Sequence, residues 1–239
     1  MIWDADTCFG AVPYRRADCS LETLLALLET HGIERALTYS LTGVHYDFEQ
    51  GNAETLAACA QHPILLPVAT VNPVRHLGCE ETVRSARERG FVALRLFPDH
   101  QGWPLDFLPL LHLLDALADI GLPLILPAGG HGTATQALRM IGGRPIPLVL
   151  SGVGYSAMAE AIAAAREAAI YVTTPRLSTP DGIEVLASAI GEDRLLLGTD
   201  SPFSYPGAAL ECARRAEVSE TVRTGILGGN LQALIGRSR

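Results

Sequence analysis

The stretch PLLHLLDALADIGLPLIL, residues 109–126, contains the unit that decides the fold. Its first twelve residues repeat leucine, alanine and isoleucine at the three- and four-residue spacing of a helix with a buried face. Gly121 marks the end of this helix, because glycine adopts the left-handed conformation that closes a helix at no steric cost. The apolar run Leu124–Leu126 then predicts a short strand, buried on both faces as in a parallel sheet.

The same order of helix, glycine and strand recurs along the chain. Gly32, Gly90 and Gly191 also separate a helical pattern from an apolar run, and Ser20 is placed to cap the first helix. The expected strands are Ile2–Asp4, Ala36–Ser40, Leu65–Val71, Val92–Leu96, Leu124–Leu126, Pro147–Leu150, Ile170–Thr173 and Leu195–Leu197. The expected helices are Ser20–Thr30, Asn52–Gln61, Glu80–Arg89, Pro109–Ile120, Thr133–Ile141, Ala157–Ala168, Pro180–Ile190 and Gly207–Ala216.

Eight such units in 239 residues predict a protein of the α/β class that folds as a (β/α)8 TIM barrel. The structural alternative is a doubly wound open sheet, which usually has fewer units. No GxGxxG sequence follows the first strand, as it does in the dinucleotide-binding form of that fold. No linker or low-complexity segment interrupts the pattern, so we expect one domain over residues 1–239.

The composition indicates a folded protein with a large core, because 48% of the residues are hydrophobic and 18% are charged. A net charge of −8 argues against a nucleic-acid partner, which needs a basic surface. No apolar run reaches the roughly 18 residues of a membrane span. The five cysteines are scattered without a CxxC pair, which is typical of reduced thiols. We therefore expect a cytoplasmic protein without a membrane partner, while association into a homo-oligomer stays open.

Polar residues gather at the carboxyl ends of the expected strands, where barrels of this kind carry their active sites. Asp4 and Asp6 are two residues apart, so both can point to the same side of an extended strand. The alternative is that one of them is a helix cap or a loop acid in solvent. The main candidates at the other strand ends are Arg95, His131, Ser151, Thr173 and Asp200.

Several stretches, taken in order, resemble the amidohydrolase superfamily in its amidohydrolase 2 branch of metal-dependent hydrolases and decarboxylases. The residues LLLGTDSPF (195–203) resemble the last strand of that barrel. The other similar stretches are LPVATVNP (66–73), residues 90–98, LVLSGVG (148–154) and ILGGNL (226–231). The resemblance spans nearly the whole chain and implies the same barrel.

The resemblance also implies a divalent metal. In that branch an HxH pair on strand one, histidines on strands five and six and an aspartate on strand eight hold it, and the aspartate handles a proton. Here the HxH position reads Asp4-Ala5-Asp6, and the two later histidine positions read Pro127 and Gly152. Asp200 is the one position that keeps the residue type of the family.

Three converging carboxylates, Asp4, Asp6 and Asp200, would repel one another by about 4 kcal/mol for each pair at 4 Å and an effective dielectric constant near 20. We favour compensation by Arg95, whose guanidinium offers a fixed fork of donors, in a site without a cofactor. One alternative is a divalent cation on the three carboxylates, Mg²⁺, Mn²⁺ or Ca²⁺ rather than Zn²⁺. The others are a raised pKa on one acid, or carboxylates that do not converge.

These expectations lead to an amidohydrolase-like enzyme, a hydrolase or decarboxylase with a degenerate metal site. Its substrate would be a small carboxylated or cyclic molecule. Asp200 would transfer a proton, Arg95 would orient an anionic group, and His131 would act from the glycine-rich loop after strand five, unless that loop only faces solvent. The residues expected to bind the substrate are Asp4, Asp6, Ser151 and Thr173. The alternative function is a catalytically inactive barrel that binds a ligand or a protein.

Overall fold

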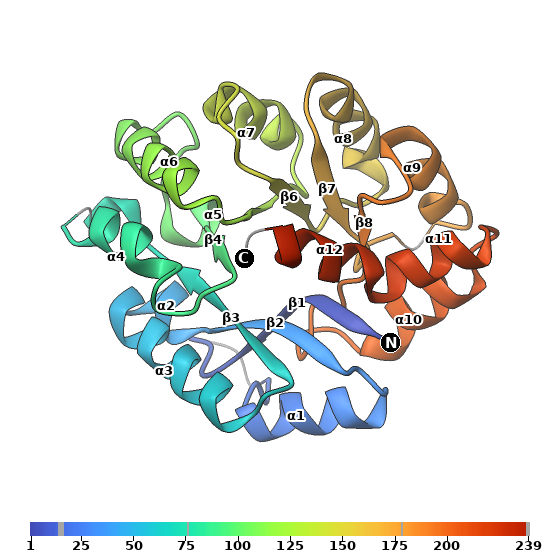
Figure 1. Ribbon diagram of the computed structural model, residues 1–239, viewed down its shortest axis with the longest axis horizontal. Coiled ribbons are helices and arrows are strands. Elements are labelled where there is room, and N and C mark those ends of the chain that lie inside the picture. Colours follow the sequence, from blue (N-terminus) through green and yellow to red (C-terminus); the bar gives the residue numbers. More distant parts are fainter. Residues whose placement is uncertain (14–16, 76, 178, 238–239) are drawn as a thin grey trace.

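The structure is a computed structural model that describes residues 1–13, 17–75, 77–177 and 179–237. Within these residues, eight parallel strands lie side by side in chain order. They form the centre of a ring of helices (Figure 1). The strands are β1 (Trp3–Phe9), β2 (Arg35–Ser40), β3 (Leu65–Thr70), β4 (Ala93–Arg95), β5 (Leu124–Pro127), β6 (Leu148–Ser151), β7 (Ile170–Thr173) and β8 (Leu195–Leu196).

Hydrogen bonds between the two ends of the sheet close it into a barrel. The Ala5 N–H donates to the Leu197 carbonyl at 2.8 Å, and the Cys8 N–H donates to the Ser201 carbonyl at 2.9 Å. Thr7 also pairs with Ser201 in a parallel bridge. The predicted TIM barrel is therefore confirmed, and the open sheet is excluded.

Helices follow the strands in turn and cover the outside of the barrel (Figure 1). The helices and helical turns are α1 (Leu21–Thr30), α2 (Thr42–His45), α3 (Phe48–Gln61), η1 (Pro73–Arg75), α4 (Cys79–Ala86), α5 (Pro98–Gln101), α6 (Leu108–Ile120), α7 (Thr133–Ile141), α8 (Tyr155–Glu167), α9 (Gly182–Ile190), α10 (Pro206–Arg215), α11 (Glu220–Thr224), η2 (Gly225–Gly229) and α12 (Asn230–Arg237). No described helix is long and apolar enough to cross a membrane.

The glycines that marked the predicted helix ends share a positive φ, although Gly191, with ψ 135°, lies outside the left-handed helical region. Gly32, Gly90, Gly121 and Gly191 all have positive φ, between 66° and 109°. The eight predicted helices are present with ends shifted by a few residues. The single turns α2 and α5 were not predicted, because one helical turn has no periodicity of its own.

The first strand is longer than predicted. The sequence analysis ended it at Asp4, but β1 continues to Phe9. Its pairing with β2 shifts register between Asp4 and Thr7. This irregularity interrupts the alternation of side chains along the strand, so residues two apart no longer share a face there.

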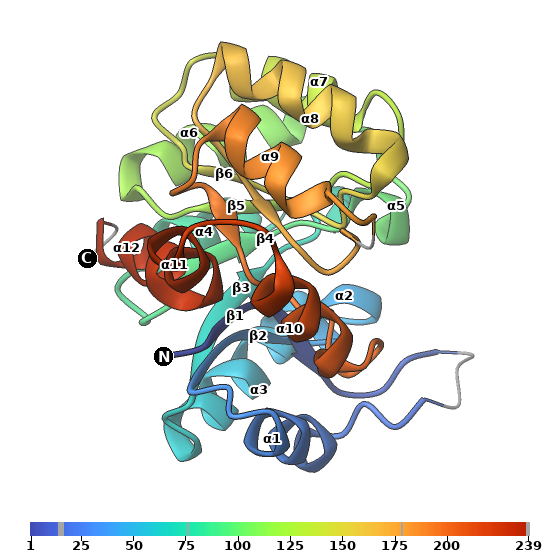
Figure 2. The same ribbon diagram turned by 90° about the vertical axis from the view of Figure 1, so that its right-hand side faces the viewer.

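Two apolar layers hold the barrel together. The larger one lies between the strands and the outer helices and includes Leu94, Leu114 and Leu150. The smaller one fills the barrel, where side chains from the strands meet Leu231 and Leu234 of α12. Helix α12 therefore closes the end of the barrel at which the strands begin, and α2 and α5 lie at the opposite end (Figure 2).

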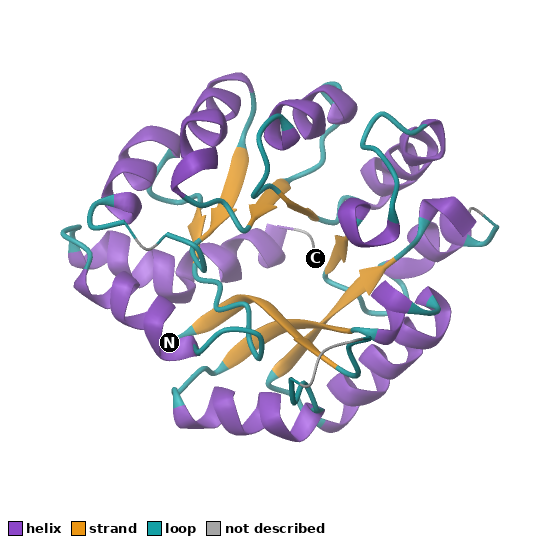
Figure 3. Cartoon of the chain, turned by 180° about the vertical axis from the view of Figure 1, so that it is seen from behind, coloured by secondary structure: helices purple, strands orange, loops and turns teal. Residues whose placement is uncertain are grey.

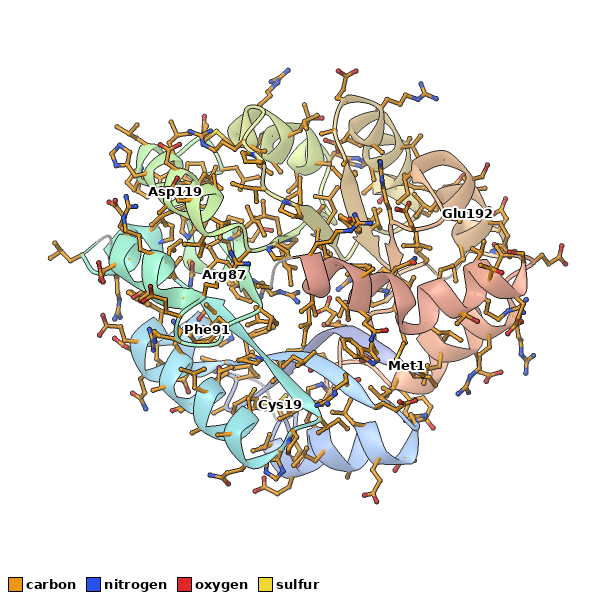
Figure 4. The ribbon with its side chains drawn as sticks, in the orientation of Figure 1. Met1, Cys19, Arg87, Phe91, Asp119 and Glu192 are labelled. Carbon is orange, nitrogen blue, oxygen red and sulfur yellow. The ribbon has the colours of Figure 1, made fainter. Side chains whose placement is uncertain are left out.

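The two ends of the barrel thus differ in what covers them. Figure 3 looks onto the end where the strands finish, which is surrounded by loops and short helices. Charged residues such as Asp119, on α6, and Glu192, in the turn after α9, lie at the outside of the barrel (Figure 4). The end seen in Figure 3 is the one where a barrel of this class presents its functional residues.

Candidate active site

A cavity of about 570 Å³ opens at the carboxyl ends of the strands. Its volume lies within the range that small-molecule sites occupy. Strands β1, β2, β4, β5 and β6 contribute to its wall, as do the loops that follow β7 and β8. The lining residues with charged or aromatic side chains are Asp6, Tyr39, His45, Arg95, Phe97, Asp99, His100, Arg176, Asp200 and Phe203.

A buried ion pair between Arg95 and Asp6 crosses the barrel from β4 to β1. The Nη1 group of Arg95 donates to Oδ1 of Asp6, and the two side chains are 9% and 5% exposed. The Nη2 group reaches the Ser151 hydroxyl at 3.3 Å. The guanidinium carbon also lies 5.0 Å from the ring centre of Tyr39 and 5.4 Å from that of Phe97. These contacts fix the guanidinium in the wall of the cavity.

The ion pair keeps Arg95 charged although it is buried. Burial alone would lower the pKa of Arg95, but the charge and hydrogen bond of Asp6, together with Tyr39 and Cys8, outweigh burial and raise that pKa above its usual value. The Nε group of Arg95 has no hydrogen-bond partner within the described residues. The cavity wall thus contains a permanent cation whose main partner is one carboxylate.

Asp4 lies apart from the cavity. It is fully buried and does not belong to the cavity lining. Its carboxylate accepts hydrogen bonds from the Asp6 N–H, at 3.0 Å, and from the Thr199 N–H, at 3.0 Å, and a further one from the Thr199 hydroxyl. Asp4 and Asp6 therefore do not face the same space as expected, because the register shift in β1 separates them. Burial raises the pKa of Asp4 to about 7 against the effect of these hydrogen bonds.

Asp200 follows β8 at the edge of the cavity in an unusual backbone conformation. Its φ is +57°, in the left-handed region that residues other than glycine seldom adopt. Burial raises the pKa of Asp200, and the nearby Asp6 adds to this effect, while Arg95 and Arg176 oppose it. Asp200 is therefore a carboxyl group that keeps its proton to a higher pH than an exposed aspartate.

The remaining predicted site residues fall into different surroundings. Ser151 lines the cavity. Thr173 is buried outside the lining, and its hydroxyl has no partner within the described residues. His131 is exposed and also lies outside the lining. The geometry does not bring Thr173 or His131 to the cavity wall, so their roles stay predictions.

The glycine-rich loop that carries His131 already holds an anionic group from the chain itself. The carboxylate of Glu160 accepts hydrogen bonds from the N–H groups of Gly132 and Thr135 at 2.8 Å each. It also accepts one from the Thr135 hydroxyl at 2.6 Å. The amino end of α7 is thus capped from within by α8.

The sequence model of the amidohydrolase family matches residues 10–237. The chain belongs to the amidohydrolase family. The match covers almost all of the barrel, and it confirms the resemblance found in the sequence. No curated protein sequence matches this amidohydrolase.

Solved structures show the same fold. A dihydroxybenzoic acid decarboxylase from Polaromonas sp. JS666, with bound manganese and the inhibitor 2-nitroresorcinol, is 18% identical with a TM-score of 0.79, over 100% of this amidohydrolase and 97% of that chain. A 5-carboxyvanillate decarboxylase from Sphingomonas paucimobilis is 16% identical with a TM-score of 0.79, over 98% of each chain. A 2,6-dihydroxybenzoate decarboxylase from Rhizobium is 17% identical with a TM-score of 0.77. That match covers 100% of this amidohydrolase and 99% of the Rhizobium chain.

Manganese in the Polaromonas enzyme keeps a divalent cation among the candidates, and the expectation of a site without a cofactor gains no support from it. The side chains of this amidohydrolase fit such a metal poorly. No three His, Cys, Asp or Glu side chains among the described residues are grouped to hold a metal ion. Pro127 and Gly152 line the cavity but offer no side-chain donor, and the Asp6 carboxylate is bound to a guanidinium.

The sequence analysis missed part of the cavity wall. Tyr39 and Phe97 lie against Arg95, and they read in the sequence as ordinary apolar residues of strands. His45 and His100 line the cavity with ring centres 5.9 Å apart, and no role was assigned to them. Arg176 was also missed, although a basic residue just after the seventh strand is a signal that could have revealed it.

Proposed function

We propose that this amidohydrolase cleaves a small carboxylated ring compound, by decarboxylation or by hydrolysis. The family supports a hydrolytic or decarboxylating reaction, and the three structural relatives described above are named as decarboxylases of carboxylated phenols. The cavity supports a substrate of that size, since it has a volume of about 570 Å³ and both aromatic and basic residues in its wall.

The observation that carries this proposal is the position of Asp200 beside the ion pair of Arg95 and Asp6. Asp200 lines the cavity and has a raised pKa. A general acid works best when its pKa lies near the working pH, because it then holds a proton and can still release it. Burial and the neighbouring Asp6 move Asp200 in that direction.

Decarboxylation gives Asp200 a defined task. The protonated carboxyl group of Asp200 donates its proton to the ring carbon that bears the substrate carboxylate, and a new C–H bond forms. The bond between that carbon and the carboxylate then breaks, its electron pair returns to the ring, and CO₂ leaves. Asp200 is left as a carboxylate and regains its proton from water. The hydroxide that remains combines with CO₂ as bicarbonate, so the charges and atoms balance.

The other residues would position these groups. Arg95 is held by Asp6 and two aromatic rings, so it can present a cation to an anionic group of the substrate without rearrangement. Asp4 binds the backbone of Asp6 and of Thr199, the residue before Asp200, and it therefore connects the two strand ends that carry the acids. No step in this scheme is assigned to a metal ion.

The second candidate is a barrel that binds a ligand without catalysing a reaction. It is favoured by the replacement of the histidine positions of the family by Pro127 and Gly152. In both candidates a small molecule binds in the cavity, but only the enzyme converts it to a product.

A turnover screen separates the two candidates. The purified protein is incubated with hydroxybenzoates and with carboxylated lactones, and CO₂ release and ring opening are measured. The enzyme predicts turnover of at least one compound, and Asp200→Asn should lower kcat by about 100-fold or more, the usual contribution of a positioned acid. Asp119→Asn, a remote exposed variant, serves as the control. Equal turnover by the Asp200 variant, or binding without turnover, would contradict the proposal.

A further inference from the structure

Arg176 belongs to the cavity, but the reaction scheme above leaves it without a task. It follows β7, its side chain is exposed, and it lines the same cavity as Arg95 and Asp200. The described residues offer it no hydrogen-bond or ion-pair partner. Its charge reaches Asp200 through space. Arg176 is thus a cation that faces the cavity without a carboxylate bound to it.

The side chain of Arg176 lies over Gly152, at the end of β6. A β-carbon at Gly152 would be 3.8 Å from the Nε atom of Arg176 and 3.9 Å from its Cδ atom. These are ordinary contact distances, so the arginine packs beside the point at which a side chain of residue 152 would begin. Gly152 also has φ +71°, a conformation that disfavours any side chain.

Gly152 is the position at which the sequence resemblance implies a metal-binding histidine. In this chain the side chain of Arg176 lies within contact distance of that position. A guanidinium therefore stands beside the place where the resemblance implies a metal ligand.

The two arginines of the cavity differ in whether a carboxylate is already bound to them. Arg95 is joined to Asp6 in a buried ion pair. The charge of Arg176 lowers the pKa of Asp200, but no hydrogen bond or ion pair joins the two side chains in the described residues. Arg176 can turn its donors to a planar anion, which a guanidinium binds through two parallel hydrogen bonds.

We propose that Arg176 binds the carboxylate of the substrate, and that the pair of guanidinium groups takes the electrostatic place of the metal ion. This inference rests on the proposed function for its substrate class, a carboxylated ring. It assigns the recognition of the carboxylate to the loop after β7 and leaves Arg95 as the fixed cation beneath it.

A binding experiment with two matched ligands tests the proposal. The affinities of 2,6-dihydroxybenzoate and of resorcinol, the same ring without the carboxylate, are measured by titration calorimetry in the presence of a chelator. The wild-type protein should bind the benzoate more tightly than resorcinol. Arg176→Gln should weaken binding of the benzoate about 10- to 100-fold, as expected for the loss of a charged hydrogen-bond donor, and leave resorcinol unchanged.

Two further variants make the result specific. Arg176→Lys keeps the charge without the planar fork and should fall between the wild-type protein and the glutamine variant. Arg166→Gln removes an exposed charge on α8, away from the cavity lining, and should change neither affinity. Equal weakening of both ligands, no difference from the Arg166 variant, or failure of the wild-type protein to prefer the carboxylate would overturn the proposal. Binding that behaves as predicted in a protein without turnover would contradict the proposed function alone.

Discussion

Arg95 is the residue that makes the most polar and aromatic contacts described in the cavity wall. It contacts an acid on one side and the rings of Tyr39 and Phe97, and its charge is kept by Asp6 despite burial. Burying two charges is costly unless each satisfies the other, so such a pair gives little net stability while its loss is expensive. A pair of this kind is better explained by a role in binding a ligand in the cavity than by a contribution to the stability of the fold.

Removing one partner of the pair should therefore be much worse than removing both. Arg95→Met leaves the buried Asp6 without a cation and should lower the free energy of unfolding by about 3–5 kcal/mol. The double variant Asp6→Leu, Arg95→Met should recover most of that loss. Urea unfolding of the single and double variants measures both effects. A double variant as unstable as the sum of the two single variants would show that the two side chains do not depend on each other.

Asp4 predicts a specific dependence of stability on pH. Its pKa is raised from 3.8 to about 7 in the folded protein, mainly by burial. The folded chain therefore holds this proton more tightly than the unfolded chain, and the free energy of unfolding should fall as pH rises from 3.8 to about 7. The contribution is complete below that window and lost above it.

The variant Asp4→Asn isolates this contribution, because it cannot ionise. Its stability, measured by urea unfolding at several pH values across the window, should fall less steeply than that of the wild-type protein. Asp119→Asn, on the surface of α6, is the control and should keep the wild-type slope. Parallel curves for the wild-type protein and the Asp4 variant would contradict a raised pKa at this position.

At the scale of elements, the sequence predicted the order of the barrel but not the detail of its first strand. Each glycine at a helix end requires a positive φ, and each buried strand requires an apolar run, so local chemistry marks both. The register shift in β1 has no such local mark, because it accompanies the closure of β1 against the chain after β8. The same holds for the site. The sequence predicted Asp6 at the cavity, but it did not predict that Asp4 lies apart from the cavity.

The partners of Arg95 show the same distinction. Its position at the end of a strand could be read from the sequence, and so could its need for a carboxylate. Which carboxylate it meets depends on the order of strands around the closed barrel. Arg176 comes from a loop, where no periodicity helps, and its path over Gly152 is visible only in three dimensions.

Helix α12 is the element whose packing can be tested most directly. Leu234 is 3% exposed and belongs to the apolar layer inside the barrel. Leu234→Ala should lower the free energy of unfolding by about 2–5 kcal/mol, because it removes buried carbon and leaves a cavity. The matched control is Leu77→Ala, at a side chain that is 80% exposed, and it should change stability by less than about 0.5 kcal/mol. A similar effect of both variants on urea unfolding would show that α12 does not close the barrel.

In the whole molecule, the packing that closes the barrel and the candidate active site lie at opposite ends of the barrel axis. Helix α12 and the amino terminus lie where the strands begin, and the cavity lies where they finish (Figure 2). The chain as a whole is acidic, with a net charge of −8, yet two arginines face the cavity. The proposed binding of an anion therefore depends on the two arginines of the cavity and not on the charge of the surface.

The central claim is that guanidinium groups replace the divalent metal in this amidohydrolase, and its metal content tests that claim most directly. The purified protein is dialysed against Mn²⁺, freed of unbound ions, and measured by mass spectrometry for metal per chain. We predict manganese far below one equivalent, unchanged in Asp200→Asn. One tightly held manganese per chain, lost in Asp200→Asn, would contradict the account, because a metal would then occupy the cavity beside Asp200.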